Sequence, residues 1–180
     1  MLFIARHCKT AWSLENKLQG SMNPPLCKEG RAEALANIPL LAPLNLNRII
    51  SSPLRRAIQT ARIYANQLHI PVEIHDDLRE LHHGAWEGRR LEDLLHSSYA
   101  LWLKDPSQIP IPGGSETIES AQRRILDATK EITARYPGEN ILIITHKHIR
   151  ALLMCAIHKS PIAKFQQYVF DETAPIKITN

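Results

Sequence analysis

The segment Asn140–Thr145 (NILIIT) places the strongest constraint on the fold, because four of its six residues are β-branched and none is charged. Such a run predicts a strand that is buried on both faces, as in parallel sheets. Three shorter apolar runs predict further strands, at Met1–Ala5, Arg48–Ser51 and Pro71–Ile74. Helical patterns lie between these runs. The alternation predicts an α/β fold, a three-layer sandwich with a mostly parallel central sheet.

Apolar residues spaced by three and four positions predict the helices. Leu54–Leu68 carries them along one face, with Ser52 as the predicted N-cap and Pro53 at the first helical position. The same spacing recurs over Ile118–Ile132, after a Pro-Gly-rich loop that makes Ser115 a candidate cap. Further helices are predicted at Lys28–Leu41, where Pro39 and Pro43 disturb the helical pattern, and at Leu91–Leu103 and His148–His158.

Composition and charge exclude several classes of protein. Hydrophobic residues make up 44% and charged residues 22% of the 180-residue chain, and no apolar run approaches the roughly 20 residues of a membrane-spanning helix. The charged residues Arg6 and His7 come too early for a secretory signal. Three widely spaced cysteines argue against a disulfide framework or a zinc knuckle. We therefore expect one cytoplasmic domain over residues 1–180, with no membrane partner.

Cationic residues follow three of the predicted strands. Arg6-His7 follows the first, Arg55-Arg56 opens the helix after the second, and His146-Lys147-His148 follows NILIIT. Positive side chains in a first helical turn oppose the helix dipole at a cost of about 0.3–1 kcal/mol each. Their recurrence at one sheet edge favours an anionic ligand, and solvated loop charge is the alternative. The net charge of +4 suits a small anion but is too mild to indicate nucleic acid.

These residues also resemble the motifs of a known family. Arg6-His7-Cys8-Lys9-Thr10 resembles the Arg-His-Gly signature of the histidine phosphatase superfamily, which includes the cofactor-dependent phosphoglycerate mutases. Other matching segments follow in the expected order, at Leu18–Gly20, Ser51–Ala61, Leu78–Leu81, Gly84–Gly88, Pro112–Ser115 and Ile144–His146. The resemblance covers most of the chain. It implies a phosphoglycerate mutase-like fold and phosphoryl transfer through a phosphohistidine.

The resemblance assigns a role to each matching side chain. His7 resembles the nucleophile, and Glu80 resembles the general acid that later activates water. Arg6 and Arg56 resemble the phosphate clamps, and His146 resembles a second histidine that donates to the same phosphoryl group. No metal or other cofactor is expected, because the arginines supply the positive charge. As an acid, Glu80 needs a raised pKa, which burial favours and nearby cations oppose.

Four further positions are possible substrate contacts. Ser13 and Gln19 stand where the family often has polar contacts, although a turn residue and a surface amide explain them equally well. Cys8 and Lys147 stand where the family has glycine, so both add a side chain near the pocket. Glu87 is expected to support local structure around the loop of the general acid. These departures leave the phosphoryl machinery complete and leave the substrate and the turnover open.

Two other phosphatase chemistries fit the sequence poorly. A cysteine phosphatase needs an arginine six positions after its nucleophile, and Leu14 stands there relative to Cys8. A metallohydrolase built from His146, His148 and the pair His82–His83 would lack an accompanying aspartate. Neither class is therefore favoured.

The predicted function is hydrolysis of a small phosphomonoester. The chain is short and has little length for a lid, and an open site favours hydrolysis over mutase chemistry because water is not excluded. In size it is most similar to the small phosphatases of the family, such as the α-ribazole phosphatase type. Mutase-type phosphoryl transfer and a phosphate-binding protein with degraded catalysis remain as alternatives.

Overall fold

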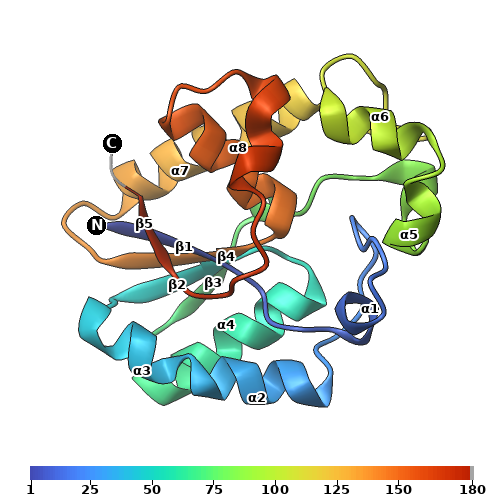
Figure 1. Cartoon of the computed structure of the whole chain (residues 1–180). Helices are drawn as coiled ribbons and strands as arrows, with labels where there is room; N and C mark the ends of the chain where they lie inside the picture. The colour runs from blue at the N-terminus through green and yellow to red at the C-terminus, as the bar shows by residue number, and fades with distance from the viewer. Residues whose placement is uncertain (179–180) are drawn as a thin grey trace.

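A computed structural model describes residues 1–178 and contains a five-stranded sheet in the order β3-β2-β4-β1-β5 (Figure 1). The strands are β1 (Leu2–Arg6), β2 (Arg48–Ser51), β3 (Val72–Ile74), β4 (Ile141–Thr145) and β5 (Ile176–Ile178). The first four strands in the chain are parallel, and β5 pairs antiparallel with β1 at the edge. The four predicted strands are confirmed to within one residue at each end, and β5 was not predicted.

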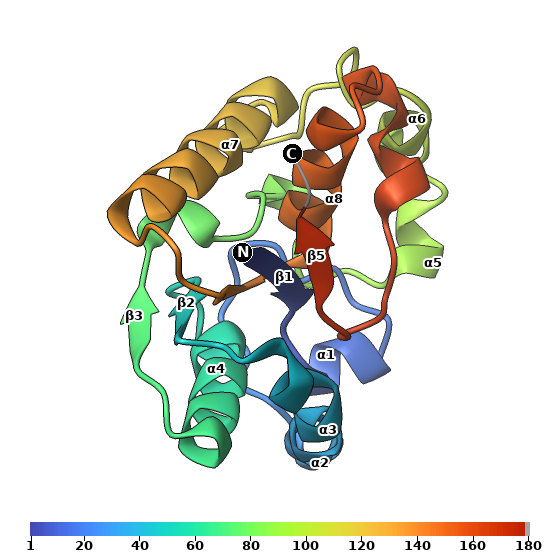
Figure 2. The same cartoon turned by 90° about the vertical axis from the view of Figure 1, so that its left-hand side faces the viewer.

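Helices cover both faces of this sheet (Figure 2). One face carries α2 (Lys28–Ala36), α3 (Ile38–Leu41) and α4 (Arg55–Leu68), and the other carries α7 (Ile118–Arg135) and α8 (Lys147–Ile157). The buried strand β4 divides its side chains between the two layers. Leu142 and Ile144 belong to the α4-side cluster, and Ile141 and Ile143 to the α8-side cluster. The predicted three-layer α/β sandwich is confirmed.

Shorter elements connect these strands and helices. They are α1 (Ala11–Leu14), α5 (Leu91–Leu94), α6 (Ser98–Lys104) and the 3-10 turns η1 (Ala42–Leu44), η2 (Asp76–Leu78), η3 (Gly84–Trp86) and η4 (Ile162–Tyr168). No helix within residues 1–178 combines the length and apolar character needed to span a membrane.

Two of the predicted helices are wrong because each is divided in two. The segment Lys28–Leu41 breaks at Asn37, since Pro39 has no N–H for a continuous helical hydrogen-bond ladder. Leu91–Leu103 breaks before α6, where the Ser97 hydroxyl accepts a hydrogen bond from the backbone of the new first turn.

Two predicted N-caps are also wrong. Helix α4 begins at Arg55 with Leu54 as its N-cap and without a side-chain cap. The Ser52 hydroxyl accepts from the Leu54 N–H at 3.3 Å, just before the helix, and lies 2.6 Å from His146 Nε2. Helix α7 is capped by Thr117 instead of Ser115. Helix α8 begins one residue earlier than predicted.

Candidate active site

The carboxyl ends of neighbouring strands place two histidines side by side. Arg6 and Thr145 are register partners at the ends of β1 and β4, so His7 and His146 follow directly at the same edge. Their rings are buried, with centroids 5.1 Å apart. The Ser52 hydroxyl, which follows β2, contacts His146 Nε2, and His146 Nδ1 has no hydrogen-bond partner within residues 1–178.

Hydrogen bonds hold His7 in one tautomer. Nδ1 lies 2.7 Å from the carbonyl oxygen of Cys8, which can only accept, so Nδ1 carries the hydrogen. Nε2 keeps its lone pair and accepts from Arg56 Nε at 3.1 Å. Burial, followed by the charges of Arg56, His146 and Arg6, holds the pKa of His7 well below its ordinary value. The imidazole is therefore neutral at neutral pH, as a nucleophile requires.

Arg56 is a fully buried cation with a fixed guanidinium. Its Nη1 and Nη2 donate to the backbone carbonyls of Met22 at 2.6 Å and Gly20 at 2.7 Å, while Nε reaches His7. Burial lowers the pKa of Arg56 to about 10, which leaves it charged at neutral pH. The planar guanidinium thus connects His7 to the loop that carries Gly20 and Met22.

Glu87 fastens that loop to the segment that carries Glu80. One carboxylate oxygen accepts from the backbone N–H groups of Ser21 at 2.8 Å and His83 at 2.9 Å. Gly20 has a φ of +51°, and a Cβ there would lie 2.1 Å from the Glu87 carboxylate, so the close approach requires glycine. The contacts of Glu87 support the structural role expected for it.

Glu80 is buried and accepts three backbone hydrogen bonds. Oε1 accepts from Leu81 at 3.0 Å and Ile149 at 3.2 Å, and Oε2 accepts from His148 at 3.3 Å. Two of these donors lie in the first turn of α8, where the helix dipole favours an anion. Burial raises the pKa of Glu80, but hydrogen bonding and charge from His148, with smaller contributions from His146 and His83, hold it well below its ordinary value. The expectation of a raised pKa is wrong for the unliganded site.

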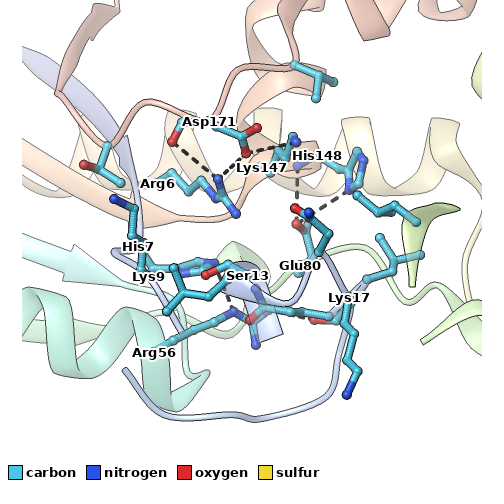
Figure 3. Close-up of a pocket in the computed structure, with 18 of the residues that line it drawn as sticks. Arg6, His7, Lys9, Ser13, Lys17, Arg56, Glu80, Lys147, His148 and Asp171 are labelled. Carbon is cyan, nitrogen blue, oxygen red and sulfur yellow. Dashed lines mark hydrogen bonds and ion pairs between the residues drawn. The ribbon is translucent and has the colours of Figure 1, made fainter. Parts of the chain in front are cut away.

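An exposed carboxylate of the same chain bridges two of the site's cations. Asp171, on the segment between η4 and β5, lies 2.5 Å from Arg6 Nη1 and 3.0 Å from Lys147 Nζ (Figure 3). The buried guanidinium of Arg150 donates to the carbonyl oxygens on either side, those of Phe170 and Glu172, both at 2.7 Å. The C-terminal segment is thereby held over the cavity.

These groups surround one cavity of about 300 Å³. Its lining includes eight of the nine predicted site residues: Arg6, His7, Cys8, Ser13, Gln19, Arg56, Glu80 and Lys147. The ninth, His146, lies against His7. Among residues 1–178, no group of three His, Cys, Asp or Glu side chains is arranged to hold a metal ion. The cavity therefore combines a neutral imidazole, a carboxylate and several cations.

The chain matches the model of the histidine phosphatase superfamily (branch 1) over residues 2–179. It belongs to this superfamily. Phosphoserine phosphatase 1 of Hydrogenobacter thermophilus is 25% identical over 96% of this chain and 83% of that protein. Adenosylcobalamin/alpha-ribazole phosphatase of Salmonella typhimurium is 29% identical over 93% and 84%. The structure of Bacillus stearothermophilus YhfR superposes with a TM-score of 0.83 at 31% identity, over 91% of this chain and 82% of that chain.

The side chains of two predicted contact residues, Ser13 and Cys8, are engaged elsewhere. The Ser13 hydroxyl is held in a capping box with Thr10, accepting from its N–H and donating to its carbonyl, both at 2.8 Å. The Cys8 thiol lies in the core 3.4 Å from the Tyr64 hydroxyl, and burial raises its pKa to about 11. By contrast, the buried Oε1 of Gln19 has no hydrogen-bond partner within residues 1–178.

Sequence reasoning missed Asp171, Arg150 and the contact of His148 with Glu80. Asp171 follows Arg6 by 165 positions, so no local pattern connects them. His82, His83 and His148 were visible in the sequence as candidate ligands of a metallohydrolase, and only the fold shows that His83 and His148 meet.

Proposed function

We propose that this superfamily member hydrolyses a small phosphomonoester through a phosphohistidine on His7. The observation that carries the proposal is the state of His7: neutral, with Nδ1–H held by the Cys8 carbonyl and Nε2 facing a cavity that also contains Glu80. A lone pair fixed in one direction is what attack on phosphorus needs. Two of the relatives named above, a phosphoserine phosphatase and an adenosylcobalamin/alpha-ribazole phosphatase, act on small phosphorylated metabolites, which supports this substrate class.

In the first step, the Nε2 lone pair attacks phosphorus and the bond from phosphorus to the leaving oxygen breaks. The Arg56 Nε–H, which faces Nε2 in the unliganded site, turns to a phosphoryl oxygen. Arg6 and the unpartnered Nδ1 of His146 serve the other oxygens if that nitrogen carries hydrogen. Such preorganised donors stabilise the charge that develops in transfer. The leaving oxygen takes a proton from Glu80.

In the second step, water replaces His7 on phosphorus. The Glu80 carboxylate takes one proton from the water, the new P–O bond forms, and the bond from Nε2 to phosphorus breaks to release inorganic phosphate. The hydrogen-bonded carboxylate of the unliganded site is already in the form that a base requires. We further propose that residues 1–180 form one domain and need no metal. A cytoplasmic location stays a prediction.

Trapping the phosphoenzyme tests the proposal. An aryl phosphate turned over and quenched in base is expected to leave an acid-labile, base-stable phosphoryl group on His7. His7→Ala removes it, and the exposed His96→Gln serves as the control that retains it. Chelation is expected to leave turnover unchanged. A phosphoryl group on Cys8, or activity restored only by a divalent ion, contradicts the mechanism. Tight phosphate binding with no turnover in wild type favours the phosphate-binding alternative.

A further inference from the structure

Two buried imidazoles lie directly behind Glu80 and take no part in the steps described above. His83 Nε2 and His148 Nδ1 are 3.0 Å apart, within hydrogen-bonding distance. The same Nδ1 lies 3.7 Å from Glu80 Oε2, an ion-pair distance when His148 is protonated (Figure 3). His148 also lines the cavity, whereas His83 does not. The order from the inside outwards is therefore His83, His148, Glu80.

The surroundings of the pair are mostly apolar. The Trp102 ring lies 5.4 Å from the His83 ring and 5.7 Å from the His148 ring, and Phe165 lies 5.9 Å from His148, measured between centroids. Besides the pair itself, the titratable side chains that interact by charge with Glu80 or His83 are His82, Tyr99, His146, Arg56 and Arg150. None of these five is a carboxylate, and the carboxylate whose charge acts on His83 is Glu80.

This arrangement decides which ring takes an added proton. Burial, followed by the charge of His148, holds the pKa of His83 well below its ordinary value, so His83 stays neutral. When His148 is an imidazolium, its Nδ1–H donates to the Nε2 of neutral His83, 3.0 Å away. A second proton on His148 gives an imidazolium whose charge lies beside the Glu80 carboxylate. The added proton then lies on His148, which is next to Glu80 and lines the cavity.

We propose that His148 stores the proton that Glu80 delivers to the leaving oxygen, and that His83 orients His148 for this transfer. The inference rests on the proposed function. In the first step the proton on Nδ1 of imidazolium His148 moves to Glu80 Oε2, 3.7 Å away, while His148 keeps the hydrogen on Nε2. Glu80 passes a proton to the leaving oxygen as the bond to phosphorus breaks. In the second step the proton from water returns through Glu80 to His148. One proton leaves and one returns, so the relay ends each cycle as it began.

The relay accounts for a difficulty in the unliganded site. Three backbone N–H groups hold Glu80 as a carboxylate, which suits the base of the second step but not the acid of the first. A proton stored on a neighbouring imidazole lets one carboxylate serve both steps. Here His148 and His83 are positioning and proton-holding residues, and Glu80 remains the group that meets the leaving oxygen.

Rapid-quench measurement of phosphoenzyme formation tests the relay. His148→Asn cannot hold the proton and is expected to slow an alkyl phosphate by about 10²-fold, because its leaving oxygen needs an acid. An aryl phosphate is expected to change by less than about threefold, since its leaving oxygen is already acidic. The exposed His96→Gln is the matched control and is expected to behave as wild type.

The pH profile separates orientation from simple packing. His83→Leu removes the acceptor and is expected to move the alkaline fall of the alkyl rate to lower pH, because the imidazolium of His148 loses a partner. His83→Gln keeps an acceptor near the Nε2 position and is expected to restore the profile. Equal losses for alkyl and aryl substrates in His148→Asn, or an unmoved alkaline limb in His83→Leu, overturn the relay.

A measurement that needs no variant in the pair is independent of the rates. Imidazole NMR at neutral pH is expected to show more imidazolium character at His148 in wild type than in Glu80→Gln, because the facing carboxylate charge favours the protonated ring. Equal spectra overturn the relay. A wild type that forms phosphohistidine while the variants show no selective loss refutes the relay alone. A wild type that forms none refutes the proposed function, and the relay falls with it.

Discussion

Lowering the pH should unfold this protein unusually early, because three buried histidines resist protonation. Burial is the largest cause that holds the pKa values of His7, His83 and His146 well below their ordinary value. In the unfolded chain each titrates near about 6.5. Below that pH the unfolded state binds more protons than the native state, so the free energy of unfolding falls as the pH falls.

The magnitude follows from counting protons. Each histidine that is charged when unfolded and neutral when folded contributes about 1.4 kcal/mol per pH unit below its unfolded pKa. Three give about 4 kcal/mol per pH unit once the unfolded chain is fully protonated. A protein with about 5–15 kcal/mol of stability should therefore lose most of it within about two to three pH units of 6.5. Glu80, whose pKa is also lowered, adds to the loss only below its own unfolded pKa.

Urea unfolding between about pH 8 and 5, followed by the fluorescence of the buried Trp86 and Trp102, measures this slope. Phosphate buffers are avoided, because a ligand of the native state adds stability. His83→Gln is expected to reduce the slope by about one proton, and the exposed His96→Gln to leave it unchanged. A free energy of unfolding that stays flat across this range would refute the neutral buried histidines.

Three substitutions test the site itself. Arg56→Lys is expected to lower kcat/KM by about 10²–10³-fold, because one ammonium cannot replace three directed N–H bonds; Arg55→Lys, on the exposed neighbour, should match wild type in an aryl phosphate assay. Glu80→Gln should slow alkyl substrates by about 10²–10⁴-fold and leave the aryl burst nearly unchanged, and equal losses would indicate a positioning role. Asp171→Asn frees two cations and should tighten inhibition by inorganic phosphate about threefold; weaker inhibition would contradict a competing carboxylate.

Most of the sheet was predictable because a buried strand carries its own signal. All five residues of β4 are buried, and their β-branched character alone marks the segment. Strand β5 has only three residues, with Lys177 at its centre, and owes its existence to pairing with β1. The predicted cap of α4 was wrong in position: the Ser52 hydroxyl accepts from the Leu54 N–H, before the helix begins, and also contacts His146, which is distant in sequence. Local patterns predict elements, and long-range contacts decide their ends.

The site was predictable where it depends on the type and order of residues. It was not predictable where it depends on which side chains the fold brings together. The cations that follow β1 and β4 were visible in sequence, and the fold brings them together as expected. The direction of the Glu80 pKa was not visible, because it depends on hydrogen bonding and charge from His148, which lies 68 positions away. The sequence indicated that burial raises this pKa and that nearby cations lower it, and in the structure His148, His146 and His83 together outweigh burial.

The reactivity of His7 and the acid sensitivity of the fold have one physical origin. Burial and the charges of Arg56 and Arg6 make an imidazolium at His7 unfavourable. They thereby keep its Nε2 lone pair free at neutral pH. The same penalty makes the unfolded chain the better proton acceptor in acid. Removing a cation to gain acid stability would therefore raise the pKa of the nucleophile and remove a donor to phosphate together. Stability at low pH has to be gained by substituting His83, which does not contact the phosphoryl group, and such a substitution would weaken the proposed relay.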